Sequence, residues 1–226
     1  MDTLEKARSA DVPADRNPDG TPDRHARILN AAEHCFVRSG FHRTTMQDVA
    51  AEAGMSPGNL YRYFPSKDAI VAGLAERDRA RVTADFAEIV GADDFVEGFR
   101  ALGRKHFEDE PRERAVLCLE IWAEATRNPA FSALVGEFDR DVHARMVTLF
   151  GQAQERGVIA PGVDLDALAT LISTMADGLF VRRAVVAGFD AAREFALVMA
   201  VMEAAFAGRL DLSLAPGRTT PQETAP

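Results

Sequence analysis

Apolar residues recur with helical spacing along most of the chain. Between residues 24 and 39 they return at intervals of three and four positions, which places them on one face of a helix. These residues are Ile28, Ala31, Ala32, Cys35 and Phe36. We find no alternating run rich in Val, Ile and Thr between hairpin turns, which is the pattern typical of strands. The sequence therefore predicts an all-α protein.

Two more short helices are predicted directly after this first one. The second begins after Thr44 or Thr45, either of which can cap it, and Thr44 with Gln47 has the form of a capping box. The third begins with Ser56 as its cap. It stops at Phe64, because the residue before a proline avoids the helical region. The N-terminal part is thus predicted to contain three short helices.

Longer helices follow a fourth one, which Ser66 caps. Glycines and prolines separate them, at about residues 93–108, 112–127, 130–156, 164–187 and 191–209. Helices of this length with short links predict an antiparallel bundle. The predicted parts are a disordered arm at 1–23, a three-helix domain at 24–70, a helical bundle domain at 71–210 and a disordered tail at 211–226.

Charge is distributed unevenly along the sequence. The 226 residues are 47% hydrophobic and carry a net charge of −9, which by itself argues against a nucleic-acid partner. Residues 81–226 hold 15 Lys and Arg against 23 Asp and Glu, whereas residues 21–80 hold 8 against 7 and three of the five histidines. The near-neutral N-terminal part can still place local charge against phosphates. Charge alone does not distinguish this interpretation from a chance asymmetry.

Several classes of protein do not match the sequence. The apolar runs are too short to span a bilayer, and the N-terminus lacks the apolar region of a secretory signal. Cys35 and Cys118 lie far apart within helical patterns, so neither a disulfide framework nor a zinc cluster is expected, and a cytoplasmic protein is favoured. No glycine-rich phosphate loop, nucleophile elbow or HExxH motif is present. We therefore predict that the protein is not an enzyme and uses no cofactor or metal.

The stretch GMSPGNLYRYFPSK, residues 54–67, interrupts this helical composition with glycine and proline. Gly54 permits a tight turn between the second and third helices, and Gly58 leaves room for close approach to another surface. Leu60 and Phe64, four positions apart, hold the third helix on the first two. Three short helices with such a turn predict a helix-turn-helix.

The polar residues of the third helix have the chemistry needed to bind DNA. A short helix fits the major groove, where Asn59 can bridge adenine and Arg62 can bridge guanine. Tyr and Thr hydroxyls and Lys67 suit phosphates. Two alternatives remain open: Tyr61 and Tyr63 could belong partly to the core, and Arg62 and Lys67 could be solvated surface residues.

Residues 41–74 resemble the DNA-binding domain of the TetR/AcrR family of bacterial transcriptional regulators. The matching elements are Gly40-Phe41, Thr44-Thr45, Val49-Ala50, Ala53-Gly54, Ser56, Gly58, Leu60-Tyr61, Tyr63-Phe64, Ser66-Lys67, Ile70 and Leu74. The resemblance covers residues 24–80, and the remainder agrees in being a helical bundle of suitable length. It implies a homodimer that places two such units on a palindromic operator in double-stranded DNA.

The resemblance also implies roles for individual residues. The residues that would hold phosphates are Thr44, Thr45, Tyr63 and Lys67. The residues that would lie nearest the bases are Ser56, Pro57, Gly58, Asn59 and Arg62. Tyr61 would sit at the boundary between phosphate and base, and Arg43 and Arg24 would add backbone contacts.

The helical bundle is where the resemblance places a ligand pocket and the dimer contact. Candidates for the pocket are Phe99, His106, Cys118, Trp122, Phe138, Met146, Phe150 and Met175. The last two predicted helices carry more apolar surface than a helix packed on one side requires, so they are candidates for an isologous four-helix interface. The residues expected there are Leu168, Ile172, Ala176, Leu179, Phe195, Val198, Met199 and Met202. For both sets, ordinary core residues are the alternative.

Glu120 and Glu124 share a helical face within a segment, LEIWAEATRNPAF, that is similar to choline-responsive regulators of the family. Facing inward, these two carboxylates would favour a cationic ligand. Facing solvent, which is the expected orientation, they would carry no such meaning.

The function that this resemblance implies is a ligand-responsive transcriptional regulator. It would repress as a homodimer on its operator and be released by a small-molecule effector of the bundle. The alternative is an all-α interaction module or a non-DNA adaptor built on a regulator fold. Such an adaptor would have no use for the phosphate donors Thr45, Tyr63 and Lys67.

Overall fold

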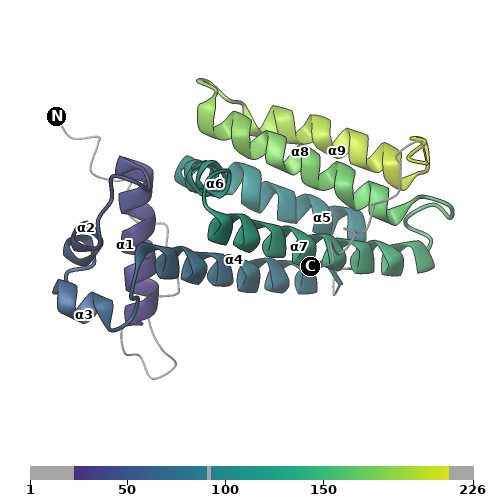
Figure 1. The fold of residues 1–226 in the computed structure, drawn as a ribbon. Helices are drawn as coiled ribbons and strands as arrows, with labels where there is room; N and C mark the ends of the chain where they lie inside the picture. Colours follow the sequence, from purple (N-terminus) through teal and green to yellow (C-terminus); the bar gives the residue numbers. More distant parts are fainter. Residues whose placement is uncertain (1–22, 91–92, 214–226) are drawn as a thin grey trace. The chain divides into compact units, whose positions relative to one another are not determined.

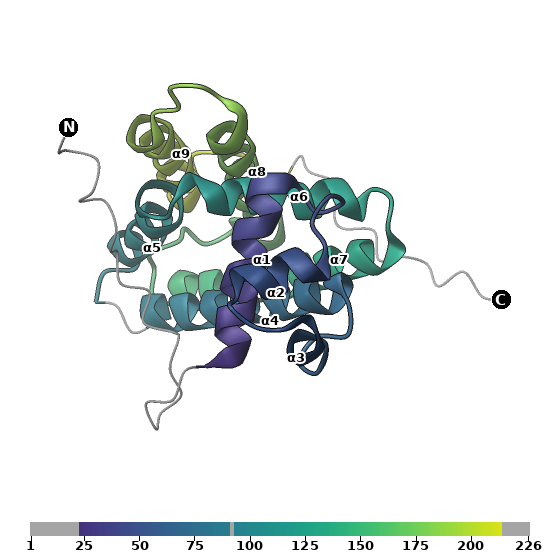
Figure 2. The ribbon, with the colours of Figure 1, turned by 90° about the vertical axis from the view of Figure 1, so that its left-hand side faces the viewer.

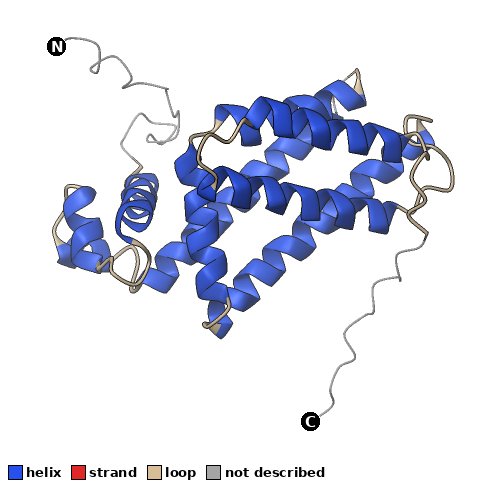
Figure 3. Ribbon diagram, turned by 90° about the horizontal axis from the view of Figure 1, so that it is seen from above, coloured by secondary structure: helices blue, strands red, loops and turns tan. Residues whose placement is uncertain are grey.

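The structure, a computed structural model, describes residues 23–90 and 93–213. All the regular secondary structure within these residues is helical, which confirms the predicted fold class (Figure 3). The chain divides into two compact units after Leu74. We call their described residues, 23–74 and 75–213, the N-terminal and C-terminal units. The predicted arm and tail lie outside the described residues, apart from Asp23 and residues 211–213.

The N-terminal unit contains α1 (Arg24–Ser39), α2 (Met46–Glu52), α3 (Pro57–Tyr61) and the beginning of α4 (Lys67–Val90). Within it α2 lies against α1 and α3 against α2 (Figure 1, Figure 2). Its core is built by the apolar positions that the helical spacing predicted. The largest fully buried side chains there are Ile28, Phe36, Leu60, Ile70 and Leu74.

The third helix is shorter than predicted, because it ends at Tyr61 and not at Phe64. After it the chain tightens into a turn, in which the amides of Tyr63 and Phe64 both donate to the carbonyl of Leu60, at 2.9 and 3.0 Å. This turn brings the Phe64 ring back into the core, where it is 7% exposed. Pro65 disfavours the helical conformation at Phe64, so a regular helix could not continue to this point.

The cap of α2 also differs from the predicted capping box. The box is formed by Thr45 and Asp48: the Thr45 hydroxyl accepts from the Asp48 amide at 3.2 Å, and the Asp48 carboxylate accepts from the Thr45 amide at 2.8 Å. Thr44 points into the core and does not take part. The helix therefore begins one residue later than the Thr44–Gln47 box requires.

The start of α4 packs closely on the rest of the N-terminal unit. A Cβ atom added at Gly73 would lie 2.9 Å from Cε1 of Phe64 and 3.1 Å from Cδ2 of Leu29. Only a residue without a side chain leaves the Phe64 ring in this position. Gly73 thus helps to hold the turn that follows α3.

The C-terminal unit is a helical bundle. It contains the rest of α4 and the elements α5 (Phe95–Arg104), η1 (Lys105–Asp109), α6 (Arg112–Ala125), α7 (Pro129–Glu155), α8 (Leu165–Val185) and α9 (Ala191–Phe206). Helices α6, α7 and α8 contact one another, and α9 contacts both α8 and α5 (Figure 1). Aromatic rings from α5, α7 and α9 meet in its core, with Phe99, Phe150 and Phe206 centred 5.9 to 6.1 Å apart.

The predicted helix 93–108 is divided into α5 and the single π-helical turn η1. Near the end of α5, a Cβ atom at Gly103 would overlap the ring of Phe195 from α9. Arg183 of α8 donates to the carbonyl of Phe107 in η1 and to that of Glu110, the residue after η1. Such widened turns are uncommon. Arg183 holds the end of this one through the two hydrogen bonds.

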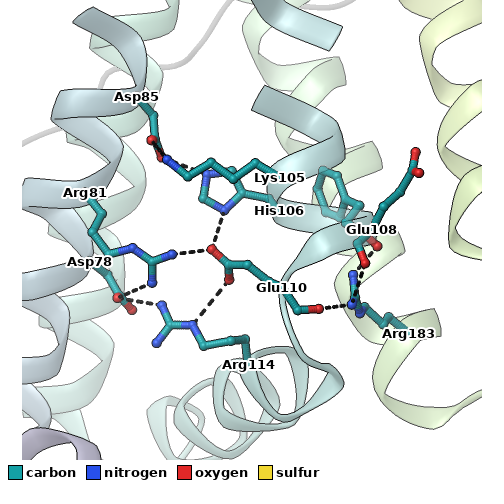
Figure 4. A network of polar contacts seen from close by, with 10 residues as sticks. Asp78, Arg81, Asp85, Lys105, His106, Glu108, Glu110, Arg114 and Arg183 are labelled. Atoms are coloured by element: carbon teal, nitrogen blue, oxygen red, sulfur yellow. Dashed lines mark hydrogen bonds and ion pairs between the residues drawn. The ribbon is translucent and has the colours of Figure 1, made fainter. Parts of the chain in front are cut away.

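A network of ion pairs surrounds this turn within the C-terminal unit (Figure 4). From α4, Asp85 accepts from Lys105 and lies 2.9 Å from Nε2 of His106. Glu110 lies 3.3 Å from Nδ1 of the same histidine and pairs with Arg81 of α4. The network therefore joins α4 to the connection between η1 and α6.

Arg114 of α6 extends the network to a second carboxylate of α4. Its Nε donates to Glu110 at 3.4 Å, and one of its terminal nitrogens donates to Asp78 at 2.7 Å. Burial by itself would raise the pKa of Glu110. The hydrogen bond from His106 and the charges of Arg81 and Arg114 instead lower it from 4.5 to about 2. The ionised form of Glu110 therefore stabilises the folded protein.

We expect Glu110→Gln to destabilise the protein near neutral pH by on the order of 2 kcal/mol, a figure discounted for partial exposure. Because the pKa of this carboxyl is lower in the folded state, its contribution is fully present above pH 4.5 and is lost as the pH falls towards 2. The difference in unfolding free energy between wild type and variant should therefore shrink with acidification. Urea unfolding at several pH values measures it.

The matched control is Glu113→Gln, which removes an exposed carboxylate from the first turn of α6. It should change stability little at any pH. A Glu110→Gln variant as stable as wild type at pH 7 would contradict the role given to this network.

Candidate nucleic-acid interface

The turn between α2 and α3 is formed as its residues require. Gly54 has a φ of 62°, in the left-handed region that favours glycine, and its amide donates to the carbonyl of Ala51 at 3.0 Å. Ser56 then caps α3 by accepting from the Asn59 amide at 3.3 Å, and Pro57 occupies the first helical position. The sequence thus ends one helix and starts the next within a few residues.

The two sides of α3 differ in burial. Leu60 is fully buried, whereas Tyr61 is 51% exposed and Arg62 is also exposed. Tyr61 therefore does not belong to the core. Ser56, Pro57 and Gly58 are exposed as well, and a Cβ atom at Gly58 would meet nothing within 4 Å. The face that starts at Ser56 has room for another molecule to approach.

Asn59 and Tyr63 lie half-buried at the edges of this face. The phenol of Tyr63 accepts from Nη1 of Arg24 at 3.4 Å, and its ring meets the edge of His25 at 5.0 Å. The hydrogen bond from Arg24 lowers the pKa of Tyr63, and Arg62 acts in the same direction. The first residues of α1 therefore lie beside the residues that follow α3.

The predicted phosphate contact of Thr44 is wrong. The residue is 1% exposed, and its hydroxyl donates to the carbonyls of Cys35 and Gly40, at 3.1 and 2.9 Å. It ties the end of α1 to the following loop and has no surface left for a phosphate. Its neighbour Thr45 is exposed, but its hydroxyl donates to Asp48 at 2.7 Å.

Lys67 also makes contacts within the N-terminal unit. Its ammonium group donates to the carbonyl of Phe41 at 2.7 Å and to that of His42 at 3.4 Å, and it lies 4.4 Å from the centre of the Phe41 ring. To donate to a phosphate, the Thr45 hydroxyl would have to give up its hydrogen bond to Asp48. Arg43 is exposed in the same loop.

The residues predicted for a ligand pocket make different contacts within the C-terminal unit. Phe99, Met146 and Phe150 are buried in the core of the C-terminal unit. His106 faces the carboxylates of Asp85 and Glu110, and Trp122 meets Phe180 edge-on at 6.4 Å. The remaining three, all of them partly buried, are Cys118, Phe138 and Met175. Packing between helices uses most of the surface that the pocket prediction assigned to a ligand.

A groove of about 700 Å³ lies elsewhere, between α8 and α9. Of the eight predicted pocket residues, only Met175 lines it. Its wall also includes Gly178, Leu197 and the ion pair between Arg182 and Glu194. This groove belongs to the helices for which a dimer contact was predicted.

Six of the eight predicted dimer residues are on the buried face of these helices. The fully or nearly fully buried ones pack into the protomer's own core: Leu168, Ile172, Leu179, Phe195, Met199 and Met202. Ala176 and Val198 are partly buried against that same core. The six buried side chains cannot face both the core and a partner, whereas Val198 also lines the groove.

Other apolar residues of α8 and α9 are exposed. They are Val181 at 38%, Val185 at 64%, Leu197 at 62% and Val201 at 40%. Val181 and Val185 lie four positions apart on α8, as do Leu197 and Val201 on α9, so each pair forms a short stripe on one face of its helix. The same helical spacing could have found these exposed residues in the sequence, if the apolar residues of each helix had been sorted into a buried stripe and an exposed one.

The expectation that Glu124 faces solvent is also wrong. Its side chain is buried, at 6% exposure for the residue, while Glu120 is half-buried. Arg127 lies 3.9 Å from one carboxylate oxygen of Glu124. A buried carboxylate near the end of α6 is a feature that sequence spacing did not indicate.

Two searches of the described residues gave negative results. No cluster of three His, Cys, Asp or Glu side chains there has the arrangement of a metal site. None of the helices described has the length and apolar character needed to cross a bilayer.

Comparison with known proteins identifies both units. Residues 28–74 match a sequence model described as bacterial regulatory proteins of the tetR family, and residues 96–207 match one described as the C-terminal region of BetI-type transcriptional repressors. The HTH-type transcriptional regulator UidR of Escherichia coli K12 is 29% identical over 153 residues, which cover 68% of this chain and 78% of UidR.

Solved structures agree with these matches. Salmonella enterica GusR is 29% identical with a TM-score of 0.69, covering 81% of this chain and 94% of GusR. A transcriptional regulator from Saccharomonospora viridis, solved with choline, is 25% identical with a TM-score of 0.68, covering 79% and 95%. With its helix-turn-helix and its helical bundle, this chain belongs to the TetR family of bacterial DNA-binding transcriptional regulators.

Proposed function

We propose that the protein represses transcription by binding a palindromic operator as a homodimer, and that a small-molecule effector releases it. The observation that carries operator binding is the orientation of α3. Leu60 and Phe64 anchor it in the core while Tyr61 and Arg62 extend outward from an open surface at Gly58. This regulatory function involves no catalysis and is exerted in the bacterial cytoplasm.

Base contacts are best assigned to the exposed start and outer face of α3. These residues are Ser56, Pro57, Gly58, Asn59 and Arg62, with Tyr61 beside them. Asn and Arg side chains read adenine and guanine through paired hydrogen bonds in the major groove. Tyr63, Thr45, Lys67 and Arg43 would contact phosphates, which fix the position of the helix on the duplex but do not read sequence.

The division of roles can be tested with three substitutions. Asn59→Ala or Arg62→Ala should relax preference at particular base pairs, each by about 1–3 kcal/mol, whereas Tyr63→Phe should weaken binding to all sequences alike. Selection of duplexes from a random pool, followed by titration of the selected and the random duplexes, measures both effects.

Arg145→Ala is the matched control, because it removes an exposed guanidinium from α7. It should leave the base preference unchanged. If wild type selects no sequence, the proposal of operator binding fails and the adaptor alternative is favoured. If the Asn59 and Arg62 variants keep the wild-type preference at every position, these residues do not read bases.

The homodimer is best assigned to the exposed apolar stripes of α8 and α9. Val181, Val185, Leu197 and Val201 present apolar side chains to solvent in the isolated protomer. Two copies related by a two-fold axis would bury both stripes in an isologous interface. The groove beside Leu197 adds a recess into which a partner side chain could pack.

We expect Leu197→Glu combined with Val201→Glu to convert the dimer into a monomer, because the interface would bury unpaired carboxylates. Light scattering during size-exclusion chromatography measures the mass. Val158→Glu is the control, since Val158 is also exposed, at 38%, but follows α7 and lies outside these stripes. A double variant that remains dimeric would exclude this face as the interface.

For an effector to release the protein from DNA, a change in the helical bundle must alter the positions of the two α3 helices of the dimer. The division between the two units falls within α4, whose later residues Asp78, Arg81 and Asp85 take part in the ion-pair network. A ligand that binds one bundle conformation more tightly would shift the population of α4 positions. The two reading helices of the dimer would then no longer match the half-sites, which lie about 34–36 Å apart.

The class of effector that we propose is a small organic cation. The BetI-type match over residues 96–207, the choline-bound relative and the buried Glu124 carboxylate support this class. Saturating choline should raise the melting temperature by several degrees, because it binds the folded state alone. It should also weaken operator binding, because it favours the bundle conformation that does not fit the operator. Thermal unfolding and DNA titration measure these changes.

Glu124→Gln should lose the response to choline, whereas the exposed Glu113→Gln should keep it. A wild-type protein that choline neither stabilises nor releases from DNA would exclude this effector class. Operator binding itself would stand.

A further inference from the structure

The turn η1 has the hydrogen bonding of a π-helix. The amide of Glu110 donates to the carbonyl of Lys105, five positions earlier, at 3.1 Å, whereas in an α-helix the donor to that carbonyl would be Asp109. Single turns of this kind are rare and often occur at functional sites. Glu110 itself is extended and Pro111 follows it, so the register of this turn can change without a change in the register of α6.

Arg183 of α8 holds this register. Its guanidinium donates to the carbonyls of Phe107 and Glu110, and to that of Glu108 at 3.5 Å (Figure 4). In an α-helical turn the donor to the Phe107 carbonyl would be residue 111, which is a proline and has no N–H group. The turn itself thus offers no α-helical partner for this carbonyl, and the guanidinium provides one from another helix.

The apolar side of η1 packs against the same helix and against α9. The Phe107 ring is centred 5.0 Å from that of Phe180 in α8 and 6.0 Å from that of Phe195 in α9. Phe195 also occupies the space where a Cβ atom at Gly103, near the end of α5, would lie. A shift of α8 or α9 would therefore change the surroundings of η1 through both Arg183 and Phe107.

The polar side of η1 depends on the register. Glu110 lies 3.3 Å from Nδ1 of His106, accepts from Arg114 at 3.4 Å and pairs with Arg81 of α4. An α-helical register would move Glu110 by about one residue along the helix, which is a rotation of about 100° about its axis. The carboxylate would then point away from these partners. The α-helical register would thus lose the pair between Glu110 and α4.

We propose that η1 is a two-register turn that couples α8 and α9 to α4. The π register, held by Arg183, keeps the pair between Glu110 and Arg81, and the α-helical register releases it. An element of this kind transmits a change between two places when each of them biases its equilibrium. This inference rests on the proposed release by an effector, and it identifies the turn through which the bundle acts on α4.

The first test is a double-mutant cycle that needs neither DNA nor an effector. The contact of Arg183 is with the backbone carbonyl of Glu110, which Glu110→Gln leaves in place. If Arg183 holds the register, the loss of unfolding free energy caused by Glu110→Gln should fall by about half or more in an Arg183→Gln protein. Arg183→Lys, which keeps a donor, should preserve most of that loss. Urea unfolding of the single and double variants measures these differences.

Arg112→Gln is the matched control for the cycle. Arg112 of α6 also donates to a backbone carbonyl, that of Ala184 in α8. Its removal costs the same kind of hydrogen bond but leaves the contacts of Arg183 with η1 in place. The effects of Arg112→Gln and Glu110→Gln should therefore add.

The second test measures whether DNA binding affects η1. If DNA selects one register, it suppresses the hydrogen exchange that proceeds through interconversion of the two. For a duplex that the wild-type protein selects from a random pool, exchange of the amides of residues 105–110 should slow about threefold or more on binding. In an Arg183→Gln protein this difference between free and bound states should shrink, whereas Arg112→Gln should leave it as in wild type. Mass spectrometry of the peptides that cover η1 measures the exchange.

The outcomes separate this inference from the proposed function. If wild type selects no duplex, operator binding and its coupling to η1 both fail. If wild type binds DNA while the exchange of η1 is unchanged, the coupling is overturned and operator binding stands. If the effects of Arg183→Gln and Glu110→Gln add, Arg183 does not hold the register. Non-additivity together with slower exchange on DNA supports both parts of the inference.

Discussion

The burial of Leu60 and Phe64 is the interaction on which the proposed DNA-reading surface depends. Helix α3 has five residues, too few to be stable without packing. Leu60 is fully buried and Phe64 is 7% exposed, and Gly73 admits the Phe64 ring where any side chain would obstruct it. Because these two contacts set the rotation of the short helix, Tyr61 and Arg62 must face away from the core. Tyr63, between Arg62 and Phe64, is held beside α1 for the same reason.

The C-terminal unit uses its charges differently, by pairing many of them internally. Asp78, Asp85 and Glu110 are each matched by Arg, Lys or His side chains around η1 (Figure 4). This pairing offsets the cost of partly burying their charges. The network joins α4 to the connection between η1 and α6. The later residues of α4 are thereby tied to the beginning of α6, the helix that carries Glu124 near its other end.

Much of the fold could be predicted from local patterns. The bounds of α1, the Ser56 cap of α3 and the breaks between the later helices follow from spacing, caps, glycine and proline. The errors occurred where the packing around a side chain decides its role. Thr44 has the hydroxyl expected of a phosphate ligand, but the carbonyls of Cys35 and Gly40 take it. Phe195 and Leu197 are both apolar residues of α9, but one is buried and the other is 62% exposed. The apolar character of these two residues does not show which one is buried.

The sequence by itself determined the class of the protein, because helical periodicity, turn residues and the ordered motif of residues 41–74 are local properties of the chain. Only the tertiary structure decided which side chains are available. Whether a hydroxyl, carboxylate or apolar group can meet another molecule depends on what packs against it. Those neighbours come from other helices, as Arg24 reaches Tyr63 across 39 positions. The register of η1, the exposed stripes of α8 and α9 and the burial of Glu124 all depend on such long-range contacts.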